Sequence, residues 1–234
     1  MVVSMNEQKL SAKEHHRQAE ELRESDKHLD ALKELDQAIV LYQEEGDYLG
    51  ICEALQSRVL TFKHFYFLTK DTAFATIAQK EADASLEVAQ SKNIAEKLSS
   101  CYFRLGEIAM IFEDFAGAIN WYQKALETYQ GSLSEKGDYR YHLGEALYRN
   151  DQKDEGKKTI FDGLGEIQKG APEVDPFLVH VWESGLHMKL ADLLRNDEPE
   201  DARKHLDIAR QIASSDPKLI IRRRQIEDIS KKFQ

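Results

Sequence analysis

Two short segments carry histidine and glutamate at spacings that could bind a metal ion. They are HHRQAE at 15–20 and HVWESGLH at 180–187. On a helix, residues three or four positions apart share a face, so each segment would gather ligand-type side chains. Zinc sites need three or four ligands in tight geometry, and neither segment offers a convincing third ligand or the order His-Glu-x-x-His. We interpret these histidines as surface or groove residues and predict neither a metal nor a cofactor.

The sequence lacks the usual motifs of enzymes that use an active-site nucleophile or bind a nucleotide. The sequence contains no GxxxxGK[ST] or GxSxG motif and no GxGxxG motif after a strand. The two cysteines, Cys52 and Cys101, stand alone, and we interpret them as reduced packing residues. We therefore predict that the chain is not an enzyme.

Charge and hydropathy argue against two classes of partner, nucleic acid and membrane. The net charge is −10, whereas nucleic-acid binding needs a clustered positive surface. The longest apolar runs fall far short of the ~20 residues that cross a bilayer. The start, MVVSMNEQKL, lacks the basic and apolar regions of a secretory signal. We expect a cytoplasmic protein that binds neither nucleic acid nor membrane.

The clearest organising feature is an internal repeat. Leu105-Gly106-Glu107 recurs 38 positions later as Leu143-Gly144-Glu145. With the same offset, small residues fall on small ones and large on large: Ala118 on Gly156, Tyr122 on Ile160, and Ala125 on Gly163. Small residues are expected where two antiparallel helices approach most closely, and large ones fill the space between them. The repeat therefore predicts stacked helical hairpins.

Helical periodicity and breaker residues divide the chain into eleven expected helices. They span 8–25, 28–45, 47–69, 71–91, 94–112, 115–130, 133–150, 153–168, 174–195, 199–215 and 217–232. Asp216-Pro217 resembles the start of the last helix. That helix places Leu219, Ile226, Ile229 and Phe233 on one face, as a capping helix would, and arginines on the other. A basic docking surface for an acidic partner is the alternative for this helix.

The segment 99–130 resembles a tetratricopeptide repeat (TPR), whose pattern is W-x2-L-G-x2-Y followed by A-x3-F. Tyr102 takes the tryptophan place, Leu105 and Gly106 match, and Ala118 and Tyr122 match in the second helix. Ala109 and Gln130 depart from the pattern, replacing a large residue and a proline. The resemblance covers roughly 12–214.

The resemblance implies an all-α fold, a right-handed α-α superhelix of about five TPR-like hairpins with a C-terminal capping helix. We expect a single domain over 1–234. Its hairpins would span 8–45, 47–91, 94–130, 133–168 and 174–215, with the cap at 217–232.

In this family the first helix of each hairpin lines a concave groove that binds a partner. The resemblance implies that the groove contains Phe103, Arg104, Glu107, Met110, Tyr141, His142, Glu145, Tyr148, Arg149 and His187. Phe103, Tyr141 and Tyr148 would anchor the partner, because aromatic residues are common in binding hot spots. We expect that replacing both tyrosines by alanine leaves folding nearly intact.

The expected function is that of a scaffold or adaptor that holds a peptide or helix of another protein. Co-chaperone repeats grip a C-terminal carboxylate with lysine and asparagine. Here the lysine positions carry His16, Phe103 and Tyr141, and the asparagine positions carry glutamate, which would repel the carboxylate. The recurrent glutamates instead favour a partner with basic residues. Two alternatives stay open: a regulator that responds to a small ligand or peptide, and self-association, for example as a homodimer, through the aromatic segment 62–75.

Overall fold

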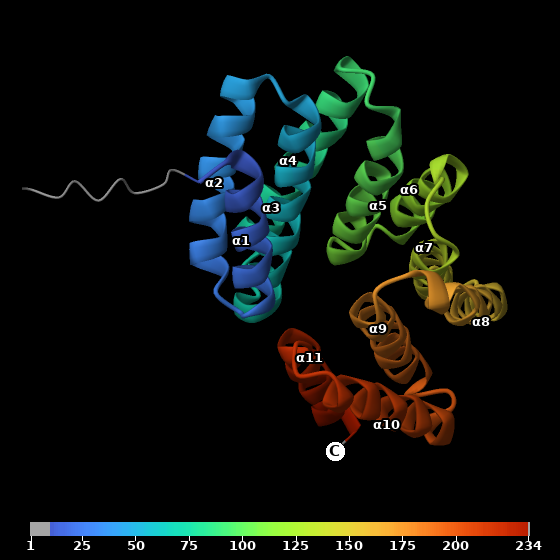
Figure 1. Cartoon of the computed structure of the whole chain (residues 1–234). Coiled ribbons are helices and arrows are strands. Elements are labelled where there is room, and N and C mark those ends of the chain that lie inside the picture. Colours follow the sequence, from blue (N-terminus) through green and yellow to red (C-terminus); the bar gives the residue numbers. More distant parts are fainter. Residues whose placement is uncertain (1–9, 234) are drawn as a thin grey trace, which may run out of the picture. The chain divides into compact units, whose positions relative to one another are not determined.

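The structure is a computed structural model that describes residues 10–233, and this part of the chain is all-α, with eleven α-helices and no strand. The predicted number of helices is confirmed, and most boundaries agree to within a few residues. Figure 1 shows the helices coloured along the chain. Their bounds are α1 Ala12–Glu24, α2 His28–Glu45, α3 Tyr48–Thr69, α4 Thr72–Ser91, α5 Ala95–Ile111, α6 Phe115–Thr128, α7 Leu133–Arg149, α8 Lys153–Gly170, α9 Pro176–Leu194, α10 Pro199–Ser215 and α11 Ile220–Ser230, with short 3-10 helices η1 Ala171–Glu173 and η2 Lys231–Phe233.

Backbone contacts divide the chain into two compact units. Unit 1 contains α1 to α4 and ends at Lys92, and unit 2 contains α5 to η2 together with Glu24–Asp26. The prediction of a single domain stays a prediction.

Unit 1 has its own core. Alanines of α1 pack against Leu35, Ala38 and Tyr42 of α2 and against Ala54 of α3. His16 from α1 adds a polar contact, with Nε2 2.9 Å from Oγ of Ser57 on α3. The three helices are therefore held by small residues that allow close approach and by a few large side chains between them.

Unit 2 consists of three hairpins, α5–α6, α7–α8 and α9–α10, whose cores are continuous from one to the next. One cluster joins α5, α6 and α7 around Phe103, Tyr122 and Leu143. A second joins α7, α8 and α9 around Tyr141 and Leu190. Because α7 and α9 each contribute to two clusters, every hairpin buries its apolar faces against a neighbour, as stacked repeats do.

Glycines set the distance between helices where the repeat predicts small residues. A Cβ atom on Gly106 would lie 2.5 Å from the ring of Tyr122. In the next hairpin, a Cβ on Gly144 would lie 2.7 Å from the carbonyl oxygen of Gly156 and from the side chain of Ile160. Contacts this short leave no room for a side chain, so the predicted role of these positions is confirmed.

Three of the five hairpin loops also share one conformation, which the sequence did not reveal. Asp26, Glu113 and Asp151 each have a positive φ, of 65°, 59° and 63°. After each of them a backbone N–H donates to the carbonyl five residues earlier, at 2.9–3.0 Å: Lys27 to Leu22, Asp114 to Ala109, and Gln152 to Leu147. This hydrogen bond ends the first helix of a hairpin and reverses the chain.

The C-terminal helix packs as the capping interpretation requires. Leu219 and Ile226 join a cluster with α9 and α10, and Ile229 and Phe233 lie against it. The helix begins at Ile220, not at Pro217 as predicted. Asp216 instead caps a turn, because its Oδ1 accepts a hydrogen bond from the backbone N–H of Lys218 at 3.0 Å.

Two of the arginines on this helix bond to the chain itself. Arg223 donates to the carbonyl oxygens of Ala213 and Asp216, both at 2.9 Å, and so satisfies the C-terminal end of α10. Arg222 donates to the carbonyl oxygen of Val181 on α9 at 3.1 Å. These side chains attach α11 to the last hairpin, which leaves them little freedom to bind an acidic partner.

Candidate functional site

The ten residues predicted to line a groove all lie in unit 2, on the first helix of each hairpin. We call them the inner-face set: Phe103, Arg104, Glu107 and Met110 on α5, Tyr141, His142, Glu145, Tyr148 and Arg149 on α7, and His187 on α9. Six are buried: Phe103, Glu107, Tyr141, Glu145, Tyr148 and His187. Arg104, Met110, His142 and Arg149 remain partly exposed.

The three proposed aromatic anchors are packed inside unit 2. Phe103 stacks on Tyr139 of α7, with ring centroids 4.1 Å apart. Tyr141 stacks on His142 at 4.2 Å, and the hydroxyl of Tyr148 donates to Oδ2 of Asp197 at 3.1 Å. Their contacts join α5, α7 and the loop between α9 and α10. Binding of a partner by these three side chains stays a prediction, but in this conformation they are part of the core.

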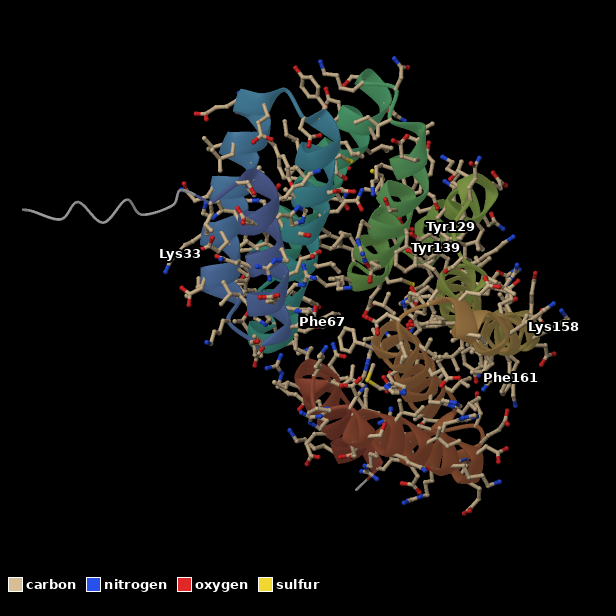
Figure 2. The ribbon with its side chains drawn as sticks, in the orientation of Figure 1. Lys33, Phe67, Tyr129, Tyr139, Lys158 and Phe161 are labelled. Atoms are coloured by element: carbon tan, nitrogen blue, oxygen red, sulfur yellow. The ribbon has the colours of Figure 1, made fainter. Side chains whose placement is uncertain are left out.

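The same aromatic cluster extends to residues that the sequence did not single out. Tyr139 contacts Tyr129, which precedes α7, with ring centroids 5.1 Å apart (Figure 2). The hydroxyl of Tyr129 donates to Oε2 of Glu135 at 2.8 Å. These contacts fix the entry into α7 and thereby the position of its inner face.

The groove glutamates are already paired with cations of the chain. Oε1 of Glu145 accepts hydrogen bonds from Nε of Arg149 and Nζ of Lys189, both at 3.0 Å. Arg149 also donates to Asp192 at 3.1 Å, and Asp192 accepts from Nζ of Lys232 at 2.7 Å. This Glu145–Asp192 network joins α7, α9 and η2. In the preceding hairpin, Arg104 likewise donates to Glu107.

The network changes the acidity of its members. Burial alone would raise the pKa of Glu145, but Lys189 and Arg149 overcome it and hold the pKa at about 2. The pKa of Asp192 is lowered in the same way, since Lys232 and Arg149 outweigh the effect of burial. Both carboxylates are therefore ionised at neutral pH and act as fixed partners for the cations around them.

A buried acid that sequence reasoning missed, Asp138, lies on α7 near the Arg104–Glu107 pair. Burial and the negative charge of Glu107 raise the pKa of Asp138 to about 8. The positive charge of Arg104 offsets this rise only in part, and Nε2 of His142 lies 3.9 Å from Oδ1 of Asp138. The spacing of three and four residues to Tyr141 and His142 places Asp138 on the same helical face. That spacing was the signal in the sequence that could have found it.

His187 pairs with a histidine of the neighbouring helix. Its Nδ1 lies 2.9 Å from Nδ1 of His205 on α10, and the rings stack at 5.1 Å. Burial, together with the nearby His205, lowers the pKa of His187 to about 4. Both rings are therefore neutral at pH 7, and one Nδ1–H donates to the other Nδ1.

The histidine, glutamate and cysteine side chains were the remaining candidates for chemistry. No group of three or more His, Cys, Asp or Glu side chains in this range is placed to hold a metal ion. Cys52 and Cys101 are both buried. None of the helices in the same range is long and apolar enough to cross a membrane.

Comparison with known proteins does not identify a family for this chain. A scan against protein-family models finds no match, and a search of curated proteins finds no similar chain. The resemblance to TPR proteins therefore rests on the residues of the sequence.

Proposed function

We propose that this chain is a cytoplasmic TPR-like scaffold that holds a segment of another protein against the inner-face set of unit 2. The segment is an extended peptide or a helix, and the hairpins form a right-handed superhelix. One observation carries the proposal: α5, α7 and α9 are joined in succession by shared clusters, and each hairpin thereby adds to one row of side chains. A row built in this way suits a segment that runs across several repeats.

The charges on this row favour an acidic segment. The carboxylate of Glu145 is only 2% exposed, whereas its partner Arg149 is 31% exposed. A basic partner, which the recurrent glutamates suggested, would have to displace Arg149 and Lys189 from Glu145. An acidic side chain can instead approach the outer atoms of Arg149 and Arg104 without breaking a bond, and Met110 offers an apolar contact beside them.

Site-specific photo-crosslinking in lysate of the source cells tests the proposal. A photoreactive residue at Met110 is expected to capture a defined partner protein. The matched control is the same residue at Phe161, which extends with Lys158 from α8 away from α7 (Figure 2). Capture from both positions, or from Phe161 alone, would contradict the proposal.

A charge-reversal pair tests the preference for an acidic segment. Arg149→Glu is expected to reduce the crosslink at Met110 several-fold, because like charges at an interface repel. Lys158→Glu makes the same change on α8 and should leave the crosslink unchanged. Circular dichroism of both variants checks that the fold survives. A stronger crosslink in Arg149→Glu would show that the partner is basic.

Self-association through unit 1 is a second candidate, favoured by a specific exposed patch. In the segment 62–75, Phe62 is buried and Phe65 stacks on Phe74 at 5.1 Å, so part of the segment packs internally. Phe67 and Leu68 are 39% and 44% exposed at the end of α3. Light scattering over a range of concentrations should show a dimer that Phe67→Ser with Leu68→Ser removes. A constant monomer mass would rule this candidate out.

A further inference from the structure

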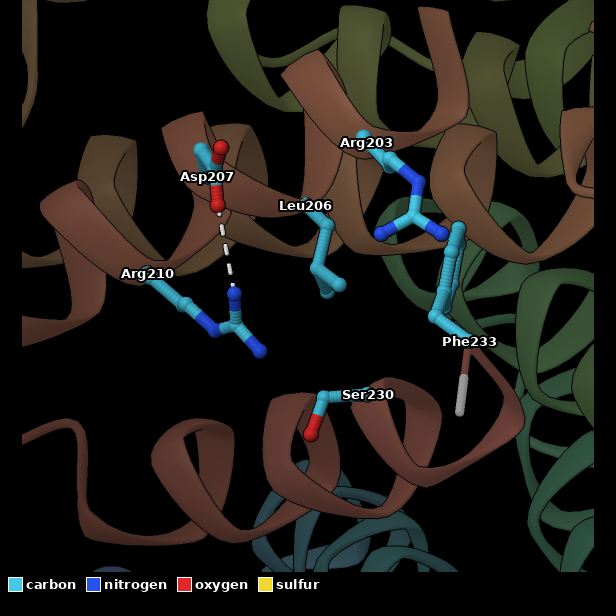
Figure 3. A pocket seen from close by; sticks show the side chains of 6 residues that line it. All are labelled: Arg203, Leu206, Asp207, Arg210, Ser230 and Phe233. Atoms are coloured by element: carbon cyan, nitrogen blue, oxygen red, sulfur yellow. Dashed lines mark hydrogen bonds and ion pairs between the residues drawn. The ribbon is translucent and has the colours of Figure 1, made fainter. Parts of the chain in front are cut away.

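A pocket lies between α10 and the C-terminal segment formed by α11 and η2, and it shares no residue with the inner-face set (Figure 3). Its volume is about 260 Å³. Pockets for small molecules are typically ~300 Å³ or larger, so this one has room for a ligand of few atoms. It is lined by Arg203, Leu206, Asp207, Arg210, Ser230 and Phe233.

The spacing on α10 explains one wall of the pocket. Leu206, Asp207 and Arg210 lie three, four and seven residues after Arg203, so the four side chains form one stripe along the helix. Leu206 is buried in the cluster that joins α9, α10 and α11, and it forms the apolar base between the two arginines.

The opposite wall is held in place by α9. Lys232 on η2 pairs with Asp192, and its carbonyl oxygen accepts a hydrogen bond from Nη1 of Arg195 at 3.3 Å. Phe233 follows directly and packs against two of the core clusters. The aromatic side of the pocket is thus fixed by contacts that lie outside it.

The pocket is lined by two arginines and one aspartate, so its side chains carry a net positive charge. The guanidinium of Arg203 lies 5.9 Å from the ring centroid of Phe233, and within residues 10–233 it has no ion-pair partner. Arg210 donates to Oδ1 of Asp207 at 3.2 Å (Figure 3). That pair is exposed, and exposed pairs contribute little free energy. An oxyanion of a ligand can therefore compete with Asp207 for Arg210.

We propose that this pocket binds a small amphiphilic anion. Its phosphate or carboxylate lies between the guanidinium groups of Arg203 and Arg210, and its aromatic or aliphatic part lies on Leu206 and Phe233. Planar guanidinium groups match both oxyanions with paired hydrogen bonds. A polyanion such as nucleic acid fits poorly, because the chain as a whole carries a charge of −10.

Isothermal titration calorimetry of the full chain at low salt tests the proposal by measuring the affinity of three probes. Phenyl phosphate contains both halves of the predicted ligand, inorganic phosphate only the anion, and benzyl alcohol only the apolar part. Phenyl phosphate is expected to bind saturably, and about tenfold more tightly than either of the others, since each half contributes its own contacts. Absence of saturable binding would overturn the proposal. Equal binding of phenyl phosphate and inorganic phosphate would overturn its apolar half.

Three variants on α10 locate the site. Arg203→Gln should weaken phenyl phosphate binding about fivefold or more, because a charge-assisted hydrogen bond is lost. Asp207→Asn should strengthen binding, since it removes the competing carboxylate without changing the shape of the side chain. Lys204→Gln is the control, since Lys204 pairs with Asp201 and does not line the pocket. Equal effects of Arg203→Gln and Lys204→Gln would place the binding elsewhere.

Discussion

At the scale of single residues, Gly106 shows how an absent side chain sets the distance between two helices. The ring of Tyr122 occupies the space that a Cβ atom would need. Gly106→Leu is expected to lower the free energy of unfolding by ~1–3 kcal/mol through overpacking. Gly165→Ala on α8 is the control, because a Cβ there meets no atom within 4 Å. Helix propensity alone should make that control stabilising, by up to ~1 kcal/mol. Urea unfolding measures both, and equal values would contradict the assigned register.

The buried tyrosines lead to a revised prediction. Replacing Tyr141 and Tyr148 together by alanine should destabilise the fold by several kcal/mol, on the order of other aromatic truncations in cores. The sequence alone led us to expect nearly intact folding. The pair Tyr141→Phe and Tyr148→Phe keeps both rings and should cost only ~1 kcal/mol per lost hydrogen bond. Thermal unfolding followed by circular dichroism compares the two. Similar melting temperatures would mean that these rings are not part of the core.

The His187–His205 pair predicts a dependence of stability on pH. Folding lowers the pKa of both rings, and that of His187 falls to about 4. A histidine with a lowered pKa stabilises the fold fully above its unfolded pKa of ~6.5 and loses that contribution as the pH falls. The free energy of unfolding should therefore decrease between pH ~6.5 and about 4. His205→Gln should flatten this decrease in urea titrations at several pH values, whereas an unchanged slope would assign it to other groups.

At the scale of elements, three of the five hairpin loops share one strained position. Glu113 has a φ of 59°, a conformation that costs a residue with a side chain ~1–2 kcal/mol. Glu113→Gly should remove this strain, and the larger entropy of glycine in the unfolded chain offsets part of the gain. A net stabilisation of up to ~1 kcal/mol is expected in urea unfolding. Glu87→Gly inside α4 is the control and should destabilise by ~1 kcal/mol. Destabilisation by both would show that Glu113 has a compensating role.

At the scale of the whole molecule, the two units differ in how much of a repeat array each contains. Unit 2 has three hairpins with continuous clusters and a capping helix, whereas unit 1 has two hairpins. Arrays of this kind need about three repeats for stability. A fragment of residues 93–234 should therefore melt cooperatively on its own, and a fragment of residues 10–92 should be marginally folded. Circular dichroism of the two fragments checks this, and a non-cooperative melt of 93–234 would contradict it.

The positions of the helices and the register of the repeat could be predicted from the sequence. Breakers and periodicity predicted eleven helices, and the offset between Gly106 and Gly144 identified where helices come closest. These features are local, because helix formation and small-residue spacing depend on neighbours within a few turns. The start of α11 was predicted less well. The helix begins at Ile220 and not at Pro217, because Asp216 caps a turn before it.

Which residues of the predicted groove stay accessible to solvent depends on the packing between helices. Helical spacing placed Tyr141, Glu145 and Arg149 on one face, and this was correct, but burial depends on the helices packed against that face. Glu145 finds its second cation in Lys189, which lies 44 positions further along the chain. The Glu145–Asp192 network, the histidine pair and the pocket at Arg203 all arise from such contacts between helices. Their partners are fixed by how the hairpins stack, and no periodicity within one helix encodes that.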